Sequence, residues 1–217
     1  MRRVKTRSDE IVGGLVTGFA ERMGLSRCRD HEFVRTTQDV QWRLSPFVDV
    51  DASNGDERIQ IFVGSGSTKV GDFLAGLPGF DGTSLGVPVG PSGNVNDLPP
   101  KLASGSWLLR AAEDVRPLGA EIANVLISRV EPFYAQFASL DDYAGMAERS
   151  EHPFVRSLSP YATAAIYWLT GRRELALKEI ERIYEAAEAQ YRKSPRSLDR
   201  ERFQVATKVK AHLHDLA

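Results

Sequence analysis

The first stretch of the chain has its apolar residues spaced as on one side of a helix. They recur at intervals of three and four residues between Ser8 and Met23, which is the period of an amphipathic α-helix. Ser8 and Asp9 suit the start of such a helix, because their side chains can accept a hydrogen bond from a free backbone N–H. Gly24 follows the last apolar position, where a glycine commonly ends a helix. The sequence therefore predicts an N-terminal helix that ends at Gly24.

A strict alternation of apolar and polar residues follows this helix. One face carries Val40, Trp42, Leu44, Val48 and Val50 and the other carries Gln41, Arg43, Phe47, Asp49 and Asp51, a pattern typical of a strand with one buried face. Pro46 lies within this run and predicts a bend or an edge position, because proline has no N–H to donate to a neighbouring strand. Asn54-Gly55 indicates a hairpin turn, and the alternation resumes from Arg58 to Val63. We expect residues 31–63 to form a three-stranded antiparallel meander.

The middle of the chain contains a predicted short helix, then a long loop, then a predicted strand. Residues 67–77 have the spacing of a short helix, whereas residues 78–105 are rich in glycine, proline, serine and asparagine. A span of that length is long for a loop within a compact domain, and such loops are usually functional or mobile. Residues 106–110 contain Trp107 and two leucines, and we expect them to return to the sheet as a further strand.

The helical period returns at Asp114 and continues to the end of the chain. The pattern predicts a long helix that restarts or kinks at Pro132 and a helical hairpin that turns at Gly171. Pro195 ends this hairpin, and Ser197 is placed to cap a last helix.

Together these patterns predict an α+β fold. We expect an N-terminal helix, an antiparallel β-meander, and then a C-terminal helical bundle packed on the sheet. The length of 217 residues suits one large domain or two small ones. We predict a single domain over residues 1–217, with a helix-plus-sheet part over 7–110 and a helical part over 111–217.

Composition disfavours nucleic-acid-binding, disulfide-bonded, secreted and membrane-spanning proteins. Lys and Arg total 28 and Asp and Glu total 29, so the chain lacks the basic excess expected of a nucleic-acid binder. Cys28 is the single cysteine, which excludes an intramolecular disulfide. The basic N-terminus is not followed by an apolar signal-peptide segment, and no stretch approaches the roughly 20 apolar residues of a membrane span. We therefore expect a cytoplasmic protein without membrane insertion.

One glycine-rich segment has the right context for binding phosphate. Residues 64–69, Gly-Ser-Gly-Ser-Thr-Lys, follow a predicted strand and precede a predicted helix. Backbone N–H groups at such a junction can hold an anion. The spacing differs from a P-loop, however, because Thr68 stands where glycine should precede the lysine. An ordinary turn is the better interpretation of this segment.

Metal binding is also weakly indicated. Asp49 and Asp51 lie on the same face of a predicted strand, with Asp56 and Glu57 across the turn, and clustered carboxylates can hold a hard cation. Acids beside an Asn-Gly turn are more often simply hydrated. The histidines do not add ligands, because His212 and His214 are two residues apart and point in different directions on a helix. We predict no metal and no cofactor.

Several motifs, taken in order, resemble a bacterial family known only as a domain of unknown function, number four-three-zero-four of that series. The resemblance spans most of residues 8–190 and is carried by structural motifs rather than catalytic ones. These motifs are Gly24, Glu32–Arg35, Val40–Trp42, Ile59–Val63, Ser106–Leu108, Val130–Tyr134, Leu140–Asp142, and Ala164–Gly171 with Ala176. The family carries no agreed activity, so the resemblance implies a fold and no chemistry.

The absence of catalytic motifs in the sequence favours a non-enzymatic protein-binding module. Similar small α+β proteins act as immunity or defence-associated factors, which suggests by analogy an unknown protein partner. Two alternatives stay open: a phosphate- or metal-dependent hydrolase or nucleotide-binding enzyme, and a phage or structural assembly protein. We predict a binding surface formed by Arg43, Phe47, Asp49, Asp51, Lys69 and Trp107.

Overall fold

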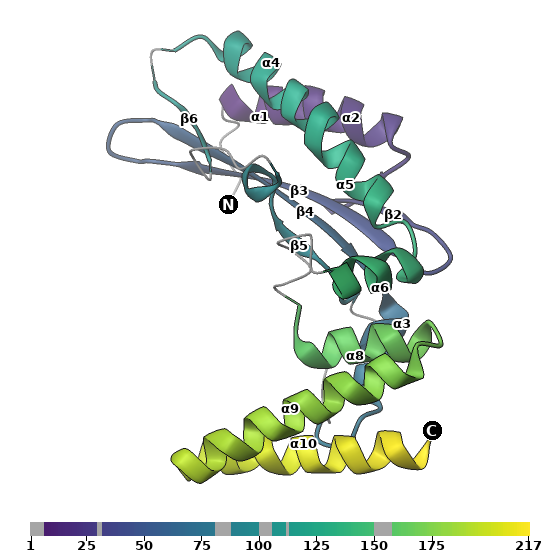
Figure 1. Cartoon of the computed structure of the whole chain (residues 1–217). Helices are drawn as coiled ribbons and strands as arrows, with labels where there is room; N and C mark the ends of the chain where they lie inside the picture. The colour runs from purple at the N-terminus through teal and green to yellow at the C-terminus, as the bar shows by residue number, and fades with distance from the viewer. Residues whose placement is uncertain (1–6, 30–31, 81–87, 100–105, 112, 150–157) are drawn as a thin grey trace. The chain divides into compact units, whose positions relative to one another are not determined.

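The computed structural model of the chain is shown in Figure 1. It describes residues 7–29, 32–80, 88–99, 106–111, 113–149 and 158–217. The chain divides into two compact units, one of residues 1–65 and 92–138 and the other of residues 66–91 and 139–217. This division does not fall at the predicted boundary between residues 110 and 111. The first unit holds the sheet together with helices from both predicted parts, and the second unit is helical.

The predicted N-terminal helix is confirmed. It consists of α1 (Arg7–Ile11), a π-helical turn η1 (Val12–Val16) and α2 (Thr17–Arg22). Gly24 ends it with a φ of 70°, a left-handed conformation that glycine adopts without strain.

The sheet has six strands among the described residues. Their order is β1-β2-β3-β4-β5, with β6 also paired to β4. The predicted meander corresponds to β2, β3 and β4, and the predicted strand near residue 108 is β6. The strand bounds are β1 Ser26–Arg29, β2 Glu32–Thr36, β3 Gln41–Val50, β4 Glu57–Gly66, β5 Ser92–Asn94 and β6 Trp107–Leu109.

The alternation in the sequence predicts the two faces of β3 correctly up to residue 49, whereas Val50, expected on the buried face, is 42% exposed. Trp42, Leu44 and Val48 are buried, whereas Phe47 and Asp49 are exposed. Pro46 lies within the strand, and the register between β2 and β3 runs only from residue 41 to Leu44. Pro46 therefore lies beyond the segment that β2 pairs, where its missing N–H costs no hydrogen bond to that strand.

The helices of the first unit cover one face of the sheet (Figure 1). After β6 the chain forms α4 (Val115–Val125), a π-helical turn η3 (Leu126–Val130) and α5 (Glu131–Gln136). The break in the helix was expected at Pro132, and the π-helical turn comes immediately before it. Proline lacks the N–H of a regular helical ladder, which accounts for the irregularity at this position.

The end of α5 is attached to the sheet by one buried carbonyl group. The indole Nε1 of Trp42 donates to the Phe137 carbonyl oxygen at 3.1 Å, and the Ser65 hydroxyl donates to the same oxygen at 2.9 Å. The ring of Trp42 stacks on that of Tyr134, with centroids 4.9 Å apart. The Tyr134 hydroxyl in turn donates to the Arg43 carbonyl. Two neighbouring strands thus hold the last turn of the helix.

The segment 78–105 contains more structure than predicted. Residues 92–94 form β5, which pairs with β4, and Val95–Asp97 form the 3₁₀ turn η2. The prediction of one long loop is wrong for these residues, because a three-residue strand and a short turn leave no periodic signal in a Gly- and Pro-rich sequence. Residues 81–87 and 100–105 lie outside the described part of the chain.

The second unit consists of helices in its described part. The predicted short helix after the sheet is α3 (Thr68–Ala75), and the predicted hairpin is formed by α8 and α9 with Gly171 at its turn. Ser197 was expected to cap the last helix but is its first helical residue, and Arg196 is at the cap position without a side-chain cap hydrogen bond. The remaining bounds are α6 Leu140–Arg149, α8 Pro160–Leu169, α9 Arg173–Lys193 and α10 Ser197–Asp215.

The helices α9 and α10 lie side by side and are joined by an aromatic seam (Figure 1). Phe203 packs against Tyr184 and Tyr191, with ring centroids 5.5 Å away in both cases. Lys210 forms an ion pair of 2.7 Å with Glu181. These contacts align the two helices along much of their length.

Within the described residues, no helix is both long and apolar enough to cross a membrane.

Glu57 fastens the N-terminal helix to the sheet of the first unit. Its carboxylate accepts hydrogen bonds from the backbone N–H groups of Arg7 and Ser8, at 3.2 and 2.6 Å, and from the Arg7 side chain. Burial alone would raise the pKa of Glu57, but the hydrogen bonds from Ser8 and Arg7 and the charge of Arg7 outweigh it and lower the pKa below the ordinary value of 4.5. The helix start thus depends on an ionised side chain from β4.

Replacing this carboxylate tests its role. Because the folded-state pKa of Glu57 is lowered, its contribution to stability is present above the ordinary carboxyl pKa and is lost as the pH falls through the folded value. We expect Glu57→Gln to reduce the free energy of unfolding by about 1–3 kcal/mol at pH 7, and by less in acid. Urea unfolding from neutral to acidic pH measures this, with the exposed Glu21→Gln as the control. An equal loss at every pH would contradict the assignment.

Gly79 of the second unit lies directly against α10. Its φ is 89°, and an added Cβ would lie 2.8 Å from Cγ2 of Val205. A side chain at this position is therefore both strained in its backbone and in collision with a neighbour.

The close approach predicts that Gly79→Ala is destabilising. We expect a loss of about 2–4 kcal/mol in the free energy of unfolding, from the left-handed backbone and the clash together. Gly145→Ala in α6 is the control, because a Cβ there meets only the tip of the Arg149 side chain at 3.4 Å. Thermal unfolding compares the two variants, and equal stability would show that the approach to Val205 is not tight.

Candidate functional site

The predicted phosphate segment is part of the sheet and its edge. Gly64, Ser65 and Gly66 are the last residues of β4, and all three are buried. The Ser65 hydroxyl is engaged by the Phe137 carbonyl, and the Ser67 N–H donates to the Val89 carbonyl at 3.0 Å. These two groups are engaged within the fold, whereas the buried Ser67 hydroxyl has no hydrogen-bond partner in the described part of the chain.

Asp51 and Asp56, near the Asn-Gly turn, likewise accept hydrogen bonds from neighbouring residues. Asp51 accepts hydrogen bonds from Ser53, which lower the pKa of Asp51, and Asp56 accepts one from the Ala111 N–H. Glu57 is turned toward the start of α1. In the described part of the chain, no three His, Cys, Asp or Glu side chains form a group that could hold a metal ion.

The six residues of the predicted binding surface do not form one patch. Arg43, Phe47 and Asp49 lie on the sheet face opposite the helices, and Asp51 lies in the loop that follows β3. Trp107 must be removed from this surface: it is only 6% exposed, and its indole N–H donates to Glu121 at 2.9 Å. In β6, residues 107 and 109 are buried and Leu108 is exposed. The sequence of a three-residue strand does not show which of its two faces is buried. Lys69 is exposed on α3, which belongs to the other unit.

The outer face of the sheet carries further apolar side chains. Phe47 is 56% exposed, Phe62 on β4 is 43% exposed, and Leu108 on β6 is 48% exposed. Leu108 is paired with Arg58 in the register, so both side chains project from this face. A pocket of about 380 Å³ beside Leu108 is lined mostly by residues 113–121, and the exposed apolar side chains of the face define no ligand by themselves.

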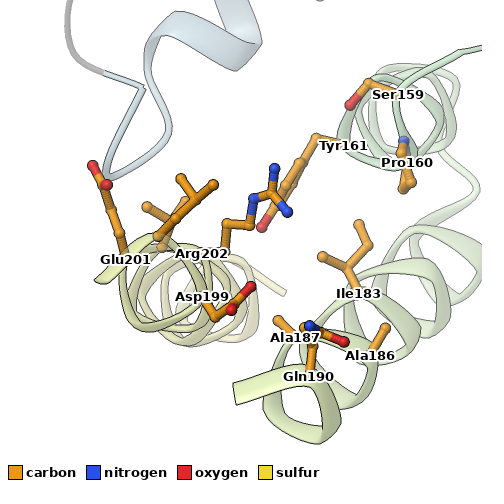
Figure 2. A pocket seen from close by; sticks show the side chains of 12 residues that line it. Ser159, Pro160, Tyr161, Ile183, Ala186, Ala187, Gln190, Asp199, Glu201 and Arg202 are labelled. Atoms are coloured by element: carbon orange, nitrogen blue, oxygen red, sulfur yellow. The ribbon is translucent and has the colours of Figure 1, made fainter. Parts of the chain in front are cut away.

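A groove of the second unit has more of the features of a binding site. It lies between the start of α8, the second half of α9 and the first half of α10, and its volume is about 740 Å³. Apolar side chains contribute most of its walls, with a few charged and polar groups among them (Figure 2). The lining residues are Ser159, Pro160, Tyr161, Ile183, Ala186, Ala187, Gln190, Leu198, Asp199, Glu201, Arg202 and Val205.

The local sequence explains why a groove remains there. Two small residues, Ala186 and Ala187, face it from α9, so that helix fills little of the space. Proline at the first position of α8 favours a helix start at that point, and Tyr161 follows it. The ring of Tyr161 is held by an edge contact with Phe80, with centroids 5.1 Å apart. Burial raises the pKa of the Tyr161 hydroxyl, which therefore stays protonated at neutral pH.

Asp199 is the most unusual residue of the groove. It is only 8% exposed, yet within the described residues its carboxylate has no hydrogen-bond or ion-pair partner. Most buried polar side chains in proteins have such a partner, because leaving a charge desolvated and unpaired is costly. Its position in the first turn of α10 favours a negative charge through the helix dipole. The Asp199 oxygens are not among the fully buried unpaired atoms of the described chain, so the groove contains a carboxylate of low exposure that still reaches solvent.

Arg202 lies one turn further along α10 and is also unpaired. Figure 2 shows that Asp199 and Arg202 both extend from α10 into the space between the helices. They form no ion pair with each other, and the Arg202 side chain has no other partner among the described residues. The groove therefore presents one acceptor and one donor group of opposite charge between apolar walls.

The sequence analysis did not identify this groove. The spacing places Phe203, Ala206, Val209, Leu213 and Leu216 on one side of the last helix; Ala206, Val209 and Leu213 are buried, whereas Leu216 is 51% exposed. Leu198 and Val205 are apolar residues on another side of that helix, and Asp199 and Arg202 line the groove with them. These two additional apolar positions are the feature of the sequence that indicates a groove on this side of the helix.

Comparisons with family models, curated proteins and solved structures find no match to this chain.

Removing the charge of Asp199 tests whether it has a structural role. Because no partner is lost, we expect Asp199→Asn to change the free energy of unfolding by no more than about 1 kcal/mol, the size of a helix-dipole contribution. This contrasts with the larger loss expected for Glu57→Gln, which removes the charge of an equally buried but fully paired carboxylate. Urea unfolding at neutral pH measures both. A loss as large as that of the Glu57 variant would mean that Asp199 stabilises the fold.

Proposed function

We propose that the protein is a non-enzymatic protein-binding module, and that the groove between α8, α9 and α10 receives a segment of its partner. One observation carries this proposal: a buried carboxylate and a nearby guanidinium, both unpaired, lie in an apolar groove. Groups of this kind are satisfied when a partner binds, and their retention in the free protein is typical of a functional surface.

The size and lining of the groove support a peptide segment as its ligand. Its volume of about 740 Å³ accommodates a few side chains, within the range of roughly 300–1,000 Å³ of ligand sites in proteins. Apolar helix faces that accept a segment of another protein are a common mode of recognition. Arginine and tyrosine, both present here as Arg202 and Tyr161, are enriched at the centres of protein interfaces.

The sequence adds a suggestion about the biological setting. The analogy with immunity and defence-associated proteins favours a partner in the same cell. We propose such a role in the cytoplasm. The phosphate-binding alternative is not favoured, because residues 64–66 of the segment that suggested it belong to β4 and the Ser67 N–H donates to the Val89 carbonyl.

Blocking the groove tests the proposal. Ala187→Trp places a large side chain in the groove, whereas Ala189→Trp adds the same bulk at an exposed position of α9 that does not line it. We expect a tagged wild-type protein and the Ala189 variant to retain the same partner from cells of the source organism. The Ala187 variant should lose at least about tenfold in affinity for it.

Mass spectrometry identifies the retained partner, and calorimetry with that purified partner measures the affinities. Circular dichroism confirms that both variants are folded. Equal binding by the two tryptophan variants would show that the partner uses another surface.

A further inference from the structure

We infer that the partner segment inserts a lysine or arginine side chain into the groove, where its charged end pairs with Asp199. This inference rests on the proposed function and specifies the chemistry of the partner. It follows from the charge, the burial and the walls of the groove.

The charges of the lining favour a basic group. Asp199 and Glu201 supply two carboxylates, and Arg202 supplies one guanidinium. Asp199 is the buried member of this set, whereas Glu201 and Arg202 are exposed. The least exposed charged side chain of the lining is therefore negative, and electrostatic complementarity favours a positive group on the partner.

The chain does not supply this positive group in its described part. Arg202 is on the same helix and close in sequence, but it forms no ion pair with Asp199. Both side chains extend into the groove without pairing (Figure 2). Arg202 thereby remains available for a carbonyl or carboxylate oxygen of the same partner segment.

The walls suit the rest of a long basic side chain. Ile183, Ala187 and Val205 line the groove with aliphatic groups. Lysine and arginine bury their methylene stems along such surfaces and keep their charged ends in polar contact. A short basic group would not gain this burial, and an acidic side chain would meet the unpaired carboxylate.

A displayed library of random linear peptides, selected on the wild-type protein, provides the test. We expect the selected peptides to combine apolar residues with at least one lysine or arginine. Fluorescence anisotropy then compares one selected peptide with a variant in which norleucine replaces the basic residue. This change should weaken binding to the wild type about tenfold or more, and should have little effect on binding to Asp199→Asn.

Glu201→Gln is the matched control, because it removes an exposed carboxylate of the same groove. We expect it to leave the effect of the norleucine substitution nearly unchanged. The Ala187→Trp variant shows whether the selected peptide occupies the groove.

The outcomes separate the two proposals. Peptides that need the groove but show no preference for a basic residue, or no coupling to Asp199, would overturn this inference and leave the proposed function standing. Peptides that bind the Ala187→Trp variant as well as the wild type, or the recovery of no peptide, would overturn both. Light scattering that shows a dimer abolished by Ala187→Trp would assign the groove to a second copy of the chain, and would also overturn the inference.

Discussion

The carbonyl group of Phe137 is the contact on which the packing of the sheet unit depends. It closes α5 and receives hydrogen bonds from Trp42 on β3 and from Ser65 on β4. A buried carbonyl at a helix end is costly if left unpaired, so these two donors are required for the helix to end on the sheet. The stacking of Trp42 on Tyr134 adds an apolar contact beside the polar one. Sheet and helix are therefore joined at one point by both kinds of interaction.

The Phe137 carbonyl and the Glu57 carboxylate of the sheet unit have hydrogen-bond donors, whereas Asp199 of the helical unit has none among the described residues. In the sheet unit, the Phe137 carbonyl and the Glu57 carboxylate are surrounded by donors from other elements. In the helical unit, Asp199 is as buried as many core residues and has no partner among the described residues. Natural proteins usually depart from local satisfaction at functional sites. The sheet unit, in its described part, also holds buried oxygens without a hydrogen-bond partner, at Ser8 and Asn96, so the binding site is placed between α8, α9 and α10 by the groove around Asp199 and not by this contrast alone.

Much of the fold could be predicted from periodicity. The alternation in β3 and β4 and the helical spacing of α9 and α10 are long enough to be recognised, and Gly24 and Gly171 mark real chain reversals. The strand β1 was missed because all four of its residues are exposed at the sheet edge, which leaves no alternation. The strand β5 is a three-residue Ser-Gly-Asn segment, which reads as a loop until β4 pairs with it.

The site was harder to predict than the fold, because it depends on tertiary contacts. Asp199 looks like an ordinary acidic residue in the first turn of a helix, and only the approach of α8 and α9 buries it. Trp107 was assigned to the surface because a short strand does not show which face is covered. Asp51 and Glu57 resembled a metal cluster until the turn and the start of α1 engaged them separately.

The central claim is that the groove of the helical unit is where a partner segment binds. An NMR titration of the ¹⁵N-labelled chain with a bound peptide tests it residue by residue. The account predicts that the largest chemical-shift changes fall on Tyr161, Ala187, Asp199 and Arg202, while the sheet residues Phe47, Phe62 and Leu108 stay unchanged. Changes centred on the sheet face, with the groove residues unaffected, would contradict it.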